Sequence, residues 1–466
     1  MNMVPTQSEL VIDPALIRKY DVNGPRYTSY PTADRFVDGF GETQAREWLS
    51  KRNIGGIKQP LSVYVHLPFC NTICYYCACN KVVTKDHGRS AKYIKYLARE
   101  MALYDEMLGD ERSICQLHWG GGTPTFLSHA EMGGLMEEIH RHFLPLPNAE
   151  YSIEIDPRKV EAGTLRFLAG LGFNRASIGV QDFDPAVQKA VNRIQSEDET
   201  RRAIDEARDS GFRSINVDLI YGLPMQHPAG FEATLDRVLT LSPDRIALYN
   251  YAHLPTVFKP QRRIHEADLP SAETRLELFT LALQKLVGEG YVYIGMDHFA
   301  KPGDDLAVAQ RQGRLHRNFQ GYSTHADSDL IAFGVSAIGR IGPTYYQNTK
   351  TLDEYYDALD WDHLPVKRGI ELTQDDLVRR ALIQALICHF KLSVESIELA
   401  YLLDFKTYFA AELADLAEFA KEGLVDITDD WIAITPRGRL LVRGICMVFD
   451  RYLRENRERA KYSRLI

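Results

Sequence analysis

A repeated pattern of helix, glycine, aromatic residue and strand most constrains what this chain can fold into. A glycine followed by an aromatic residue ends a helical stretch and precedes a strand-like stretch at 172–173, 211–212 and 290–291. Leucines recur at helical spacing before the first of these pairs, and apolar residues alternate with others over 176–180 after it. The second interval is about twice the first and leaves room for a further strand at 244–250. Strands that alternate with helices predict parallel βαβ units.

Three more strands are expected upstream, at 61–66, 115–119 and 150–156, with helices near 90–109 and 129–143. Six or seven βαβ units predict an α/β fold that is a full or partial (β/α) barrel. A doubly wound open sheet is the alternative.

The two ends of the chain differ from its middle. Residues 1–50 are polar and rich in turns, and we expect an N-terminal arm there. Residues 51–370 are expected to form the barrel, and residues 371–466 a mostly helical C-terminal domain with a short strand pair within 424–442. That domain is either a packing or lid domain or a winged-helix shape.

Net charge and hydropathy exclude several classes of protein. A net charge of −8 argues against general nucleic-acid binding. No basic segment with an apolar run behind it opens the sequence, and no stretch of about 18 consecutive apolar residues occurs. We expect a cytoplasmic protein without a secretory signal or a membrane span.

Four of the seven cysteines lie within ten residues, at Cys70, Cys74, Cys77 and Cys79. This group directly follows the first expected strand, and the loops after barrel strands form the active face. Thiolates are soft ligands that suit iron–sulfur clusters or zinc. Structural zinc sites usually combine two separated cysteine pairs, so crowding on one loop favours a cluster. The remaining cysteines, Cys115, Cys388 and Cys446, are expected to be buried small apolar residues.

The spacing CxxxCxxC after a first strand resembles the signature of the radical S-adenosylmethionine superfamily. This resemblance implies a [4Fe–4S] cluster held by Cys70, Cys74 and Cys77, with the fourth iron open to S-adenosylmethionine. The hard chemistry would then belong to the cofactor, and the protein would orient and shield it.

Longer motifs narrow the resemblance. GPRYTSYPT, YVHLPFC, HWGGGTPT, SIEIDPR, NVDLIYGLP and LHRNFQGY together resemble the oxygen-independent coproporphyrinogen III oxidase (coproporphyrinogen dehydrogenase) family of haem and porphyrin biosynthesis, from about residue 15 to the last residues. The chain departs from the family at Ala78, where a glycine is usual. This departure would matter if the backbone there needed a positive φ or approached a ligand.

The resemblance also implies functional residues. Glycines that follow the second strand either admit a ligand or simply form a tight turn. The resemblance favours contacts with S-adenosylmethionine from the following residues: Tyr64, Tyr76, Cys77, Ala78, Gly120, Gly121, Gly122, Thr123, Glu154, Gln181, Arg193, Asp218, Ala252 and Ile338. It implies two S-adenosylmethionine molecules per site and a role in activity for Cys79 outside cluster ligation.

The implied substrate, coproporphyrinogen III, carries four carboxylates, for which arginines are natural partners. Arg26 is the preferred candidate, and Arg311, Arg314 and Arg317 are others. The implied reaction turns two propionates into vinyl groups and gives protoporphyrinogen IX. We expect an electron donor such as flavodoxin or ferredoxin, an unidentified electron acceptor, and a monomer.

Three other functions stay open. A haem-binding chaperone related to this family also keeps CxxxCxxC, but such relatives lack the CxC cysteine and the N-terminal GPRYTSYPT arm. Another radical enzyme acting on tetrapyrroles would give methylated or ring-opened products. A zinc-dependent regulator would use the C-terminal domain, and iron and sulfide analysis would test it.

Overall fold

The structure is a computed structural model that describes residues 10, 13–52, 59–326, 328–455 and 462. The chain divides into two compact units. Unit 1 comprises residues 1–35, 272–326 and 372–466, and unit 2 comprises residues 36–271 and 327–371. This division groups segments that are distant in sequence. The sequence-based boundaries near residues 50 and 370 concern consecutive domains and stay a prediction.

Unit 2 is built on a sheet whose central strands run parallel. The strands expected from the sequence are confirmed within a few residues at their ends. In the described part of the sheet, β8 (Arg245–Asn250) and β13 (Asp329–Phe333) are not paired with each other. The predicted barrel is therefore partial and open. The parallel strands, in spatial order, are β13 (Asp329–Phe333), β1 (Leu61–Leu67), β4 (Ser113–Gly121), β5 (Leu144–Ile155), β6 (Arg175–Gln181), β7 (Ser214–Tyr221) and β8 (Arg245–Asn250).

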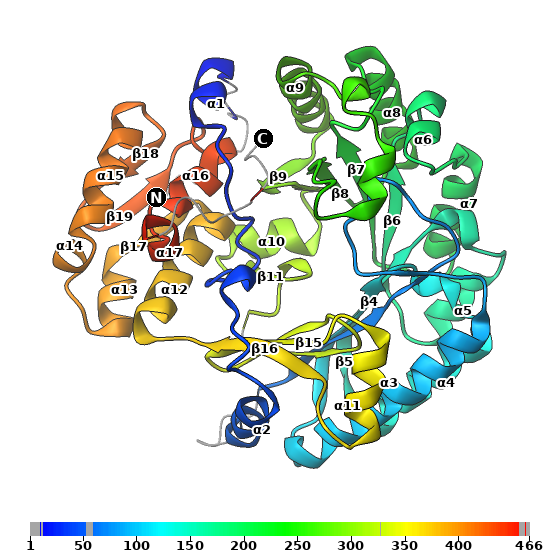
Figure 1. The fold of residues 1–466 in the computed structure, drawn as a ribbon. Coiled ribbons are helices and arrows are strands. Elements are labelled where there is room, and N and C mark those ends of the chain that lie inside the picture. The colour runs from blue at the N-terminus through cyan, green and yellow to red at the C-terminus, as the bar shows by residue number, and fades with distance from the viewer. Residues whose placement is uncertain (1–9, 11–12, 53–58, 327, 456–461, 463–466) are drawn as a thin grey trace. The chain divides into compact units, whose positions relative to one another are not determined.

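Helices follow the outer side of these strands (Figure 1). A doubly wound sheet carries helices on both faces, so the arrangement excludes this alternative. The helices expected near 90–109 and 129–143 are confirmed. The helices of this outer layer are α3 (His87–Leu108), α4 (His129–His142), α5 (Thr164–Gly170), α6 (Pro185–Ala190), α7 (Glu197–Asp209) and α8 (Pro228–Leu241).

The two faces of the parallel sheet differ in polarity. Val63, Leu117 and Ile153 are buried and belong to the face that the helices cover. Successive residues of a strand point to opposite faces, so Tyr64 and His118, which are register partners, belong to the other face. That polar face holds the side chains of the candidate site.

Unit 2 also contains an antiparallel extension that the sequence analysis did not predict. Beyond β13 lie β14 (Ile338–Ile341), β15 (Thr344–Asn348) and β16 (Val366–Glu371), each antiparallel to its neighbour. These strands are short, and no Gly-aromatic pair of the repeating kind precedes them. Helices α2 (Glu42–Lys51) and α11 (Leu352–Asp360) complete the unit.

Unit 1 is mostly helical, as expected for its C-terminal part. A small antiparallel sheet contains, in spatial order, β17 (Lys391–Ser393), β19 (Trp431–Ile434) and β18 (Val425–Ile427). Its strand β17 was not predicted. A second hairpin joins β11 (His316–Asn318) and β12 (Gly321–Ser323). The remaining elements are α1 (Pro14–Tyr20), α9 (Ala272–Gly288), α10 (Asp305–Arg311), α12 (Gln374–His389), β17 (Lys391–Ser393), α13 (Val394–Tyr401), α14 (Phe405–Tyr408), α15 (Ala410–Lys421), β18 (Val425–Ile427), β19 (Trp431–Ile434), α16 (Val442–Met447) and α17 (Arg451–Glu455).

The last expected strand of the repeat needs a correction. Gly290 ends α9 with a φ of 86°, as the pattern predicts, and β9 (Val292–Gly295) follows. However, β9 pairs antiparallel with β10 (His298–Ala300) and belongs to unit 1. Gly295 and Met296 have φ values of 136° and 54°, which reverse the chain at once. The single strand expected here is therefore two strands, and β9 is antiparallel to β10 rather than part of a parallel βαβ unit.

Two further expectations concern membrane-spanning helices and the three single cysteines. Within the described ranges, every helix is too short or too polar to cross a bilayer. Cys115, Cys388 and Cys446 are buried, which confirms that they serve as small core residues.

Candidate active site

The four clustered cysteines occupy a loop that follows β1 in unit 2. The loop is closed at its base by the parallel pair β2 (Phe69–Cys70) and β3 (Val82–Val83). The N–H of Val82 donates to the carbonyl of Pro68 at 2.7 Å, and the N–H of Thr84 donates to that of Cys70 at 2.9 Å. Because these bonds fix both ends of the loop, the thiols are held at the carboxyl end of a barrel strand.

The thiols of this loop have different surroundings. The Sγ of Cys70 lies 3.5 Å from the hydroxyl of Thr123, and burial raises the pKa of Cys70 to about 11. A hydrogen bond from Cys79, aided by the ammonium of Lys81, lowers the pKa of Cys77 to about 6. The same contact and charge of Cys77 raise the pKa of Cys79, which is exposed on the surface.

Cys74 lies against two arginines. The Sγ of Cys74 is 3.7 Å from Nη2 of Arg158 and 3.7 Å from Nη1 of Arg193. Asp156 pairs with both guanidinium groups, at 2.6 Å and 3.4 Å respectively. Arg193 is buried and also donates to the carbonyl of Gly179 at 2.7 Å. Arg193 was predicted from the sequence, whereas Asp156 and Arg158 were missed, although both stand in the SIEIDPR motif.

The glycine run at the end of β4 leaves space for neighbouring side-chain and backbone atoms of the protein. A Cβ added to Gly120 would lie 2.7 Å from Oε1 of Glu154, and one added to Gly121 would lie 2.7 Å from the His66 ring. A Cβ on Gly122 would lie 2.6 Å from the carbonyl oxygen of Pro68. The three glycines are thus explained by tight packing around the cysteine loop. A contact between this run or Thr123 and S-adenosylmethionine stays a prediction.

Glu154 is the centre of a polar cluster on the inner face of the sheet. It accepts hydrogen bonds from the N–H of Gly121 at 3.1 Å and from Nε2 of His118 at 3.3 Å. Burial raises the pKa of Glu154, but these two bonds outweigh it and the pKa falls below its usual range. The ring of Tyr64 stacks on that of His118 at 5.7 Å, and its hydroxyl lies 3.0 Å from Nδ1 of His66. His66 and His118 were missed as site residues.

Asp218 of β7 and Gln181 at the end of β6 extend the cluster. Asp218 accepts hydrogen bonds from Ser177 at 2.9 Å and from Asn216 at 2.8 Å. Burial, together with the charge of Glu154, raises the pKa of Asp218 to about 6. Gln181 has a φ of 69°, which is unusual for a residue with a Cβ. Such strain occurs preferentially at functional sites.

Gln261 links two other predicted residues. Its Nε2 donates to the backbone carbonyls of Tyr76 at 3.0 Å and of Ala252 at 3.1 Å, and its side chain is buried. Gln261 lies in a short 3₁₀ helix, so no sequence period marked it. Ile338 begins β14 in the same unit and pairs in register with Gln347.

Ala78 and Arg26 are two predicted residues that lie outside the polar cluster around Glu154. Ala78 is exposed and its φ is not positive, so the methyl group that replaces the usual glycine meets no backbone restriction. Arg26 belongs to unit 1, where it donates to Asp297 at 2.8 Å. Its role toward a substrate stays a prediction.

The donor set of the loop suits an iron–sulfur cluster. Among the described residues, no three ligating side chains are close enough together to hold a single metal ion. A [4Fe–4S] cluster binds each cysteine through a different iron, and Cys70, Cys74 and Cys77 offer three soft ligands from one fixed loop. The guanidinium groups beside Cys74 would also stabilise the negative charge of thiolate ligands.

Comparison with known proteins agrees with this site. The Radical SAM superfamily profile matches residues 64–238, and that of the HemN C-terminal domain matches residues 372–441. The oxygen-independent coproporphyrinogen III oxidase of Pseudomonas aeruginosa is 52% identical, with 97% of this chain and 98% of the relative covered. That of Escherichia coli is 49% identical over 97% of this chain and 98% of the relative.

A solved structure shows the same fold. Coproporphyrinogen III oxidase (HemN) from Escherichia coli, described as a radical SAM enzyme, matches with a TM-score of 0.91 and 47% identity. The match covers 96% of this chain and 100% of that structure. The chain therefore belongs to the oxygen-independent coproporphyrinogen III oxidase family of radical SAM enzymes.

Proposed function

We propose that this chain converts coproporphyrinogen III to protoporphyrinogen IX without oxygen, in haem and porphyrin biosynthesis. The observation that carries the proposal is the fixed CxxxCxxC loop at the carboxyl end of β1, in a chain whose relatives match it over nearly its whole length. The inner polar face beside this loop supplies the groups that a radical enzyme needs to orient its cofactor.

The reaction changes two propionate side chains into vinyl groups. From each –CH2–CH2–COO⁻ group, a hydrogen atom leaves the carbon next to the pyrrole ring. The resulting radical passes one electron to an acceptor, and the bond to the carboxylate breaks with release of CO2. The products are –CH=CH2 and CO2, and each propionate loses one hydrogen atom and one electron.

The cofactor residues divide into two groups. Cys70, Cys74 and Cys77 would hold the [4Fe–4S] cluster, which with S-adenosylmethionine supplies the organic radical that takes the hydrogen atom. Glu154 and Asp218 of the inner face would accept hydrogen bonds from the amino and hydroxyl groups of S-adenosylmethionine. The same proposal includes the remaining predicted contacts, which are those with Tyr64, Tyr76, Cys77, Ala78, Gly120, Gly121, Gly122, Thr123, Gln181, Arg193, Ala252 and Ile338.

Several finer points are part of the proposal. Two radical events per substrate are met by two S-adenosylmethionine molecules per site. A reduced flavodoxin or ferredoxin supplies electrons to the cluster, and a separate one-electron acceptor takes them from the substrate radical. Arg26 and Cys79 act toward the substrate. The protein works as a cytoplasmic monomer, with residues 1–50 as an arm, 51–370 as the catalytic domain and 371–466 as the C-terminal domain.

The test is an anaerobic assay of protein with a reconstituted cluster. S-adenosylmethionine, a strong reductant, a cell extract as acceptor source and coproporphyrinogen III are supplied, and porphyrins and 5′-deoxyadenosine are followed by mass-resolved chromatography. Protoporphyrin is expected from the wild type and not from Cys74→Ser. Cys115→Ser is the matched control, since Cys115 is buried in the core away from the loop.

The products also separate the alternatives. If S-adenosylmethionine is cleaved but no vinyl product forms, the decarboxylation proposal is wrong. Tight haem binding without turnover would then indicate a haem chaperone, and methylated or ring-opened tetrapyrroles would indicate another radical reaction.

A further inference from the structure

Arg317 in unit 1 is a buried cation that has no carboxylate partner in the part of the chain that the structure describes. Its side chain is 3% exposed and stacks on the ring of Tyr322, with 4.8 Å between the guanidinium carbon and the ring centroid. Its Nε donates to the backbone carbonyl of Arg26 at 3.4 Å, and its Nη1 has no hydrogen-bond partner among the described residues. Burying an uncompensated charge is unfavourable, so such a group is expected to gain an anionic partner in the working protein.

Arg439 lies in the same unit, is half-buried and also stacks on an aromatic ring. Its guanidinium stacks on Phe390 at 5.2 Å, and its Nε has no partner among the residues that the structure describes. A Cβ added to Gly295 would lie 2.6 Å from the Tyr322 hydroxyl and 3.3 Å from the Phe390 ring. The aromatic rings that carry the two arginines therefore flank one glycine.

Charged groups of both signs lie near the buried Tyr293 in this region. The charges of Arg317, Arg439, Arg443 and Asp297 all act on the hydroxyl of Tyr293, which places three cations and one anion around it. Asp297 is itself paired with Arg26 at 2.8 Å. The group formed by Arg26, Arg317, Arg439, Arg443 and Asp297, here called the arginine cluster, thus has an excess of positive charge.

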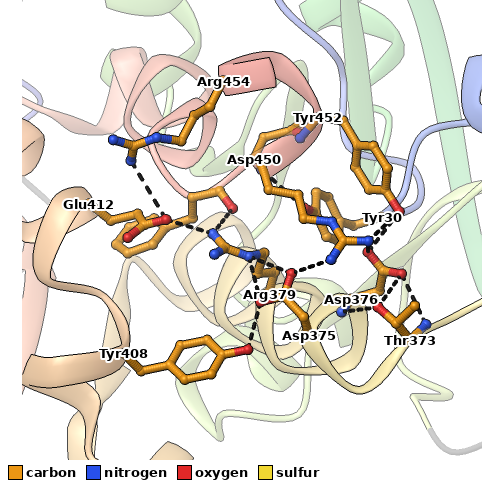
Figure 2. A network of polar contacts seen from close by, with 12 residues as sticks. Tyr30, Thr373, Asp375, Asp376, Arg379, Tyr408, Glu412, Asp450, Tyr452 and Arg454 are labelled. Atoms are coloured by element: carbon orange, nitrogen blue, oxygen red, sulfur yellow. Dashed lines mark hydrogen bonds and ion pairs between the residues drawn. The ribbon is translucent and has the colours of Figure 1, made fainter. Parts of the chain in front are cut away.

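Other arginines of unit 1 behave differently. Figure 2 shows a network in which each arginine has a carboxylate partner. Arg379 lies 2.9 Å from Asp375 and 2.9 Å from Glu412, and Arg451 lies 2.9 Å from Asp375. Arg454 lies 3.6 Å from Glu412. Each arginine of this network is therefore paired with a carboxylate, whereas Arg317 and Arg439 of the arginine cluster have no carboxylate partner among the described residues.

We propose that Arg317 and Arg439 bind a propionate carboxylate of the tetrapyrrole substrate. A guanidinium that stacks on a ring keeps its N–H edge for a planar bidentate contact with a carboxylate. The substrate carries four such groups. Arg317 and Arg439 have no carboxylate partner among the described residues, so a substrate carboxylate would neutralise their charge. This proposal rests on the proposed function, because the ligand class comes from the substrate.

The test uses coproporphyrin III, the stable oxidised form of the substrate, and its tetramethyl ester, which has no carboxylate. Each is titrated by fluorescence into the full chain without cluster, so that binding is measured apart from catalysis. Arg317→Gln and Arg439→Gln are each expected to weaken coproporphyrin binding about 10- to 100-fold, the effect of losing a charge-assisted bond. Arg317→Lys should recover part of the loss, and ester binding should not change.

Arg437→Gln is the matched control, because Arg437 is exposed two residues before Arg439 and pairs with Asp13 at 2.6 Å. It should bind like the wild type. Thermal unfolding supplies a second readout. Removal of an unpaired buried charge should leave the melting temperature of Arg317→Gln unchanged or higher, and coproporphyrin should stabilise the wild type more than this variant.

The possible outcomes distinguish carboxylate binding by the arginine cluster from a purely structural role of Arg317. Wild-type binding in Arg317→Gln and Arg439→Gln would overturn the proposal. A large drop in the melting temperature of Arg317→Gln would show a structural role for Arg317, and Arg439→Gln would then decide whether the cluster binds carboxylate. Equally tight binding of the ester and coproporphyrin by the wild type would also overturn the proposal, because the carboxylates would then not contribute to binding. If the wild type binds neither compound, the substrate class in the proposed function is wrong instead.

Discussion

Replacing Glu100 by glutamine is expected to remove a pH dependence of stability that the wild-type chain carries. Glu100 lies in α3 and is fully buried in unit 2. It accepts hydrogen bonds from the hydroxyl of Tyr355 at 2.6 Å, the N–H of Gly334 at 2.8 Å and the amide of Asn348 at 2.7 Å. The carboxyl thus ties α3 to the segments on both sides of β14.

The direction of the effect follows from the pKa of Glu100. Burial raises this pKa from 4.5 to about 7, because desolvation outweighs the three hydrogen bonds. Between these values the folded chain keeps a proton that the unfolded chain has lost. Its stability contribution is therefore complete below pH 4.5 and is lost as the pH rises through 7. The loss is roughly 3.4 kcal/mol in full and about 2.5 kcal/mol between pH 5 and 8.

The free energy of unfolding is measured by urea titration at pH 5, 6, 7 and 8. Tryptophan fluorescence reports mainly on unit 2, because Trp48, Trp119 and Trp361 lie there. The quantity of interest is the wild-type value minus that of Glu100→Gln, since other titrating groups cancel in the difference. It should fall by about 2.5 kcal/mol from pH 5 to pH 8.

Glu106→Gln is the control, because Glu106 is exposed on the same helix. This variant removes one carboxylate from the same helix and leaves the hydrogen bonds of Glu100 in place. A difference between the wild type and Glu100→Gln that stays constant within about 0.5 kcal/mol would refute the reasoning, because it would mean that Glu100 titrates alike in both states.

Three other substitutions test the candidate site. Gly121→Ala places a Cβ 2.7 Å from His66 at a φ of 116°, so urea titration should show a loss of about 1–3 kcal/mol and calorimetry weaker S-adenosylmethionine binding. Arg193→Gln leaves the buried Asp156 with less positive charge and should destabilise the chain by about 3–5 kcal/mol, whereas an unchanged urea midpoint would contradict the pairing. Ala78→Gly should change stability by less than about 0.5 kcal/mol and leave the iron content after reconstitution unaltered.

The parallel strands were predictable because their signals are local. A glycine that ends a helix and an alternating apolar stretch after it are properties of neighbouring residues, and Gly172 and Gly211 indeed have φ values of 100° and 90°. The pairing of β9 was not predictable in this way. Its helix and glycine repeat the same pattern, and the positive φ values of Gly295 and Met296 after the strand reverse the chain.

The site was predicted in part for the same reason. The cysteine loop is continuous in sequence, so its spacing alone indicated a cluster. Gln261, His66 and His118 acquire their importance only from long-range contacts, such as the bond between Gln261 and the carbonyl of Tyr76. No period or motif in one sequence marks a residue whose partner is distant in the chain.

The arginines between 311 and 317 show what burial adds. In the sequence Arg311, Arg314 and Arg317 are equivalent candidates for carboxylate binding. In the structure Arg311 donates to the carbonyl of Pro302 and Arg314 contacts Gln312, and both are exposed. Arg317 alone of the three is buried on an aromatic ring with an unmatched donor. Exposed arginines are satisfied by water, so the buried residue is the one whose charge requires a ligand.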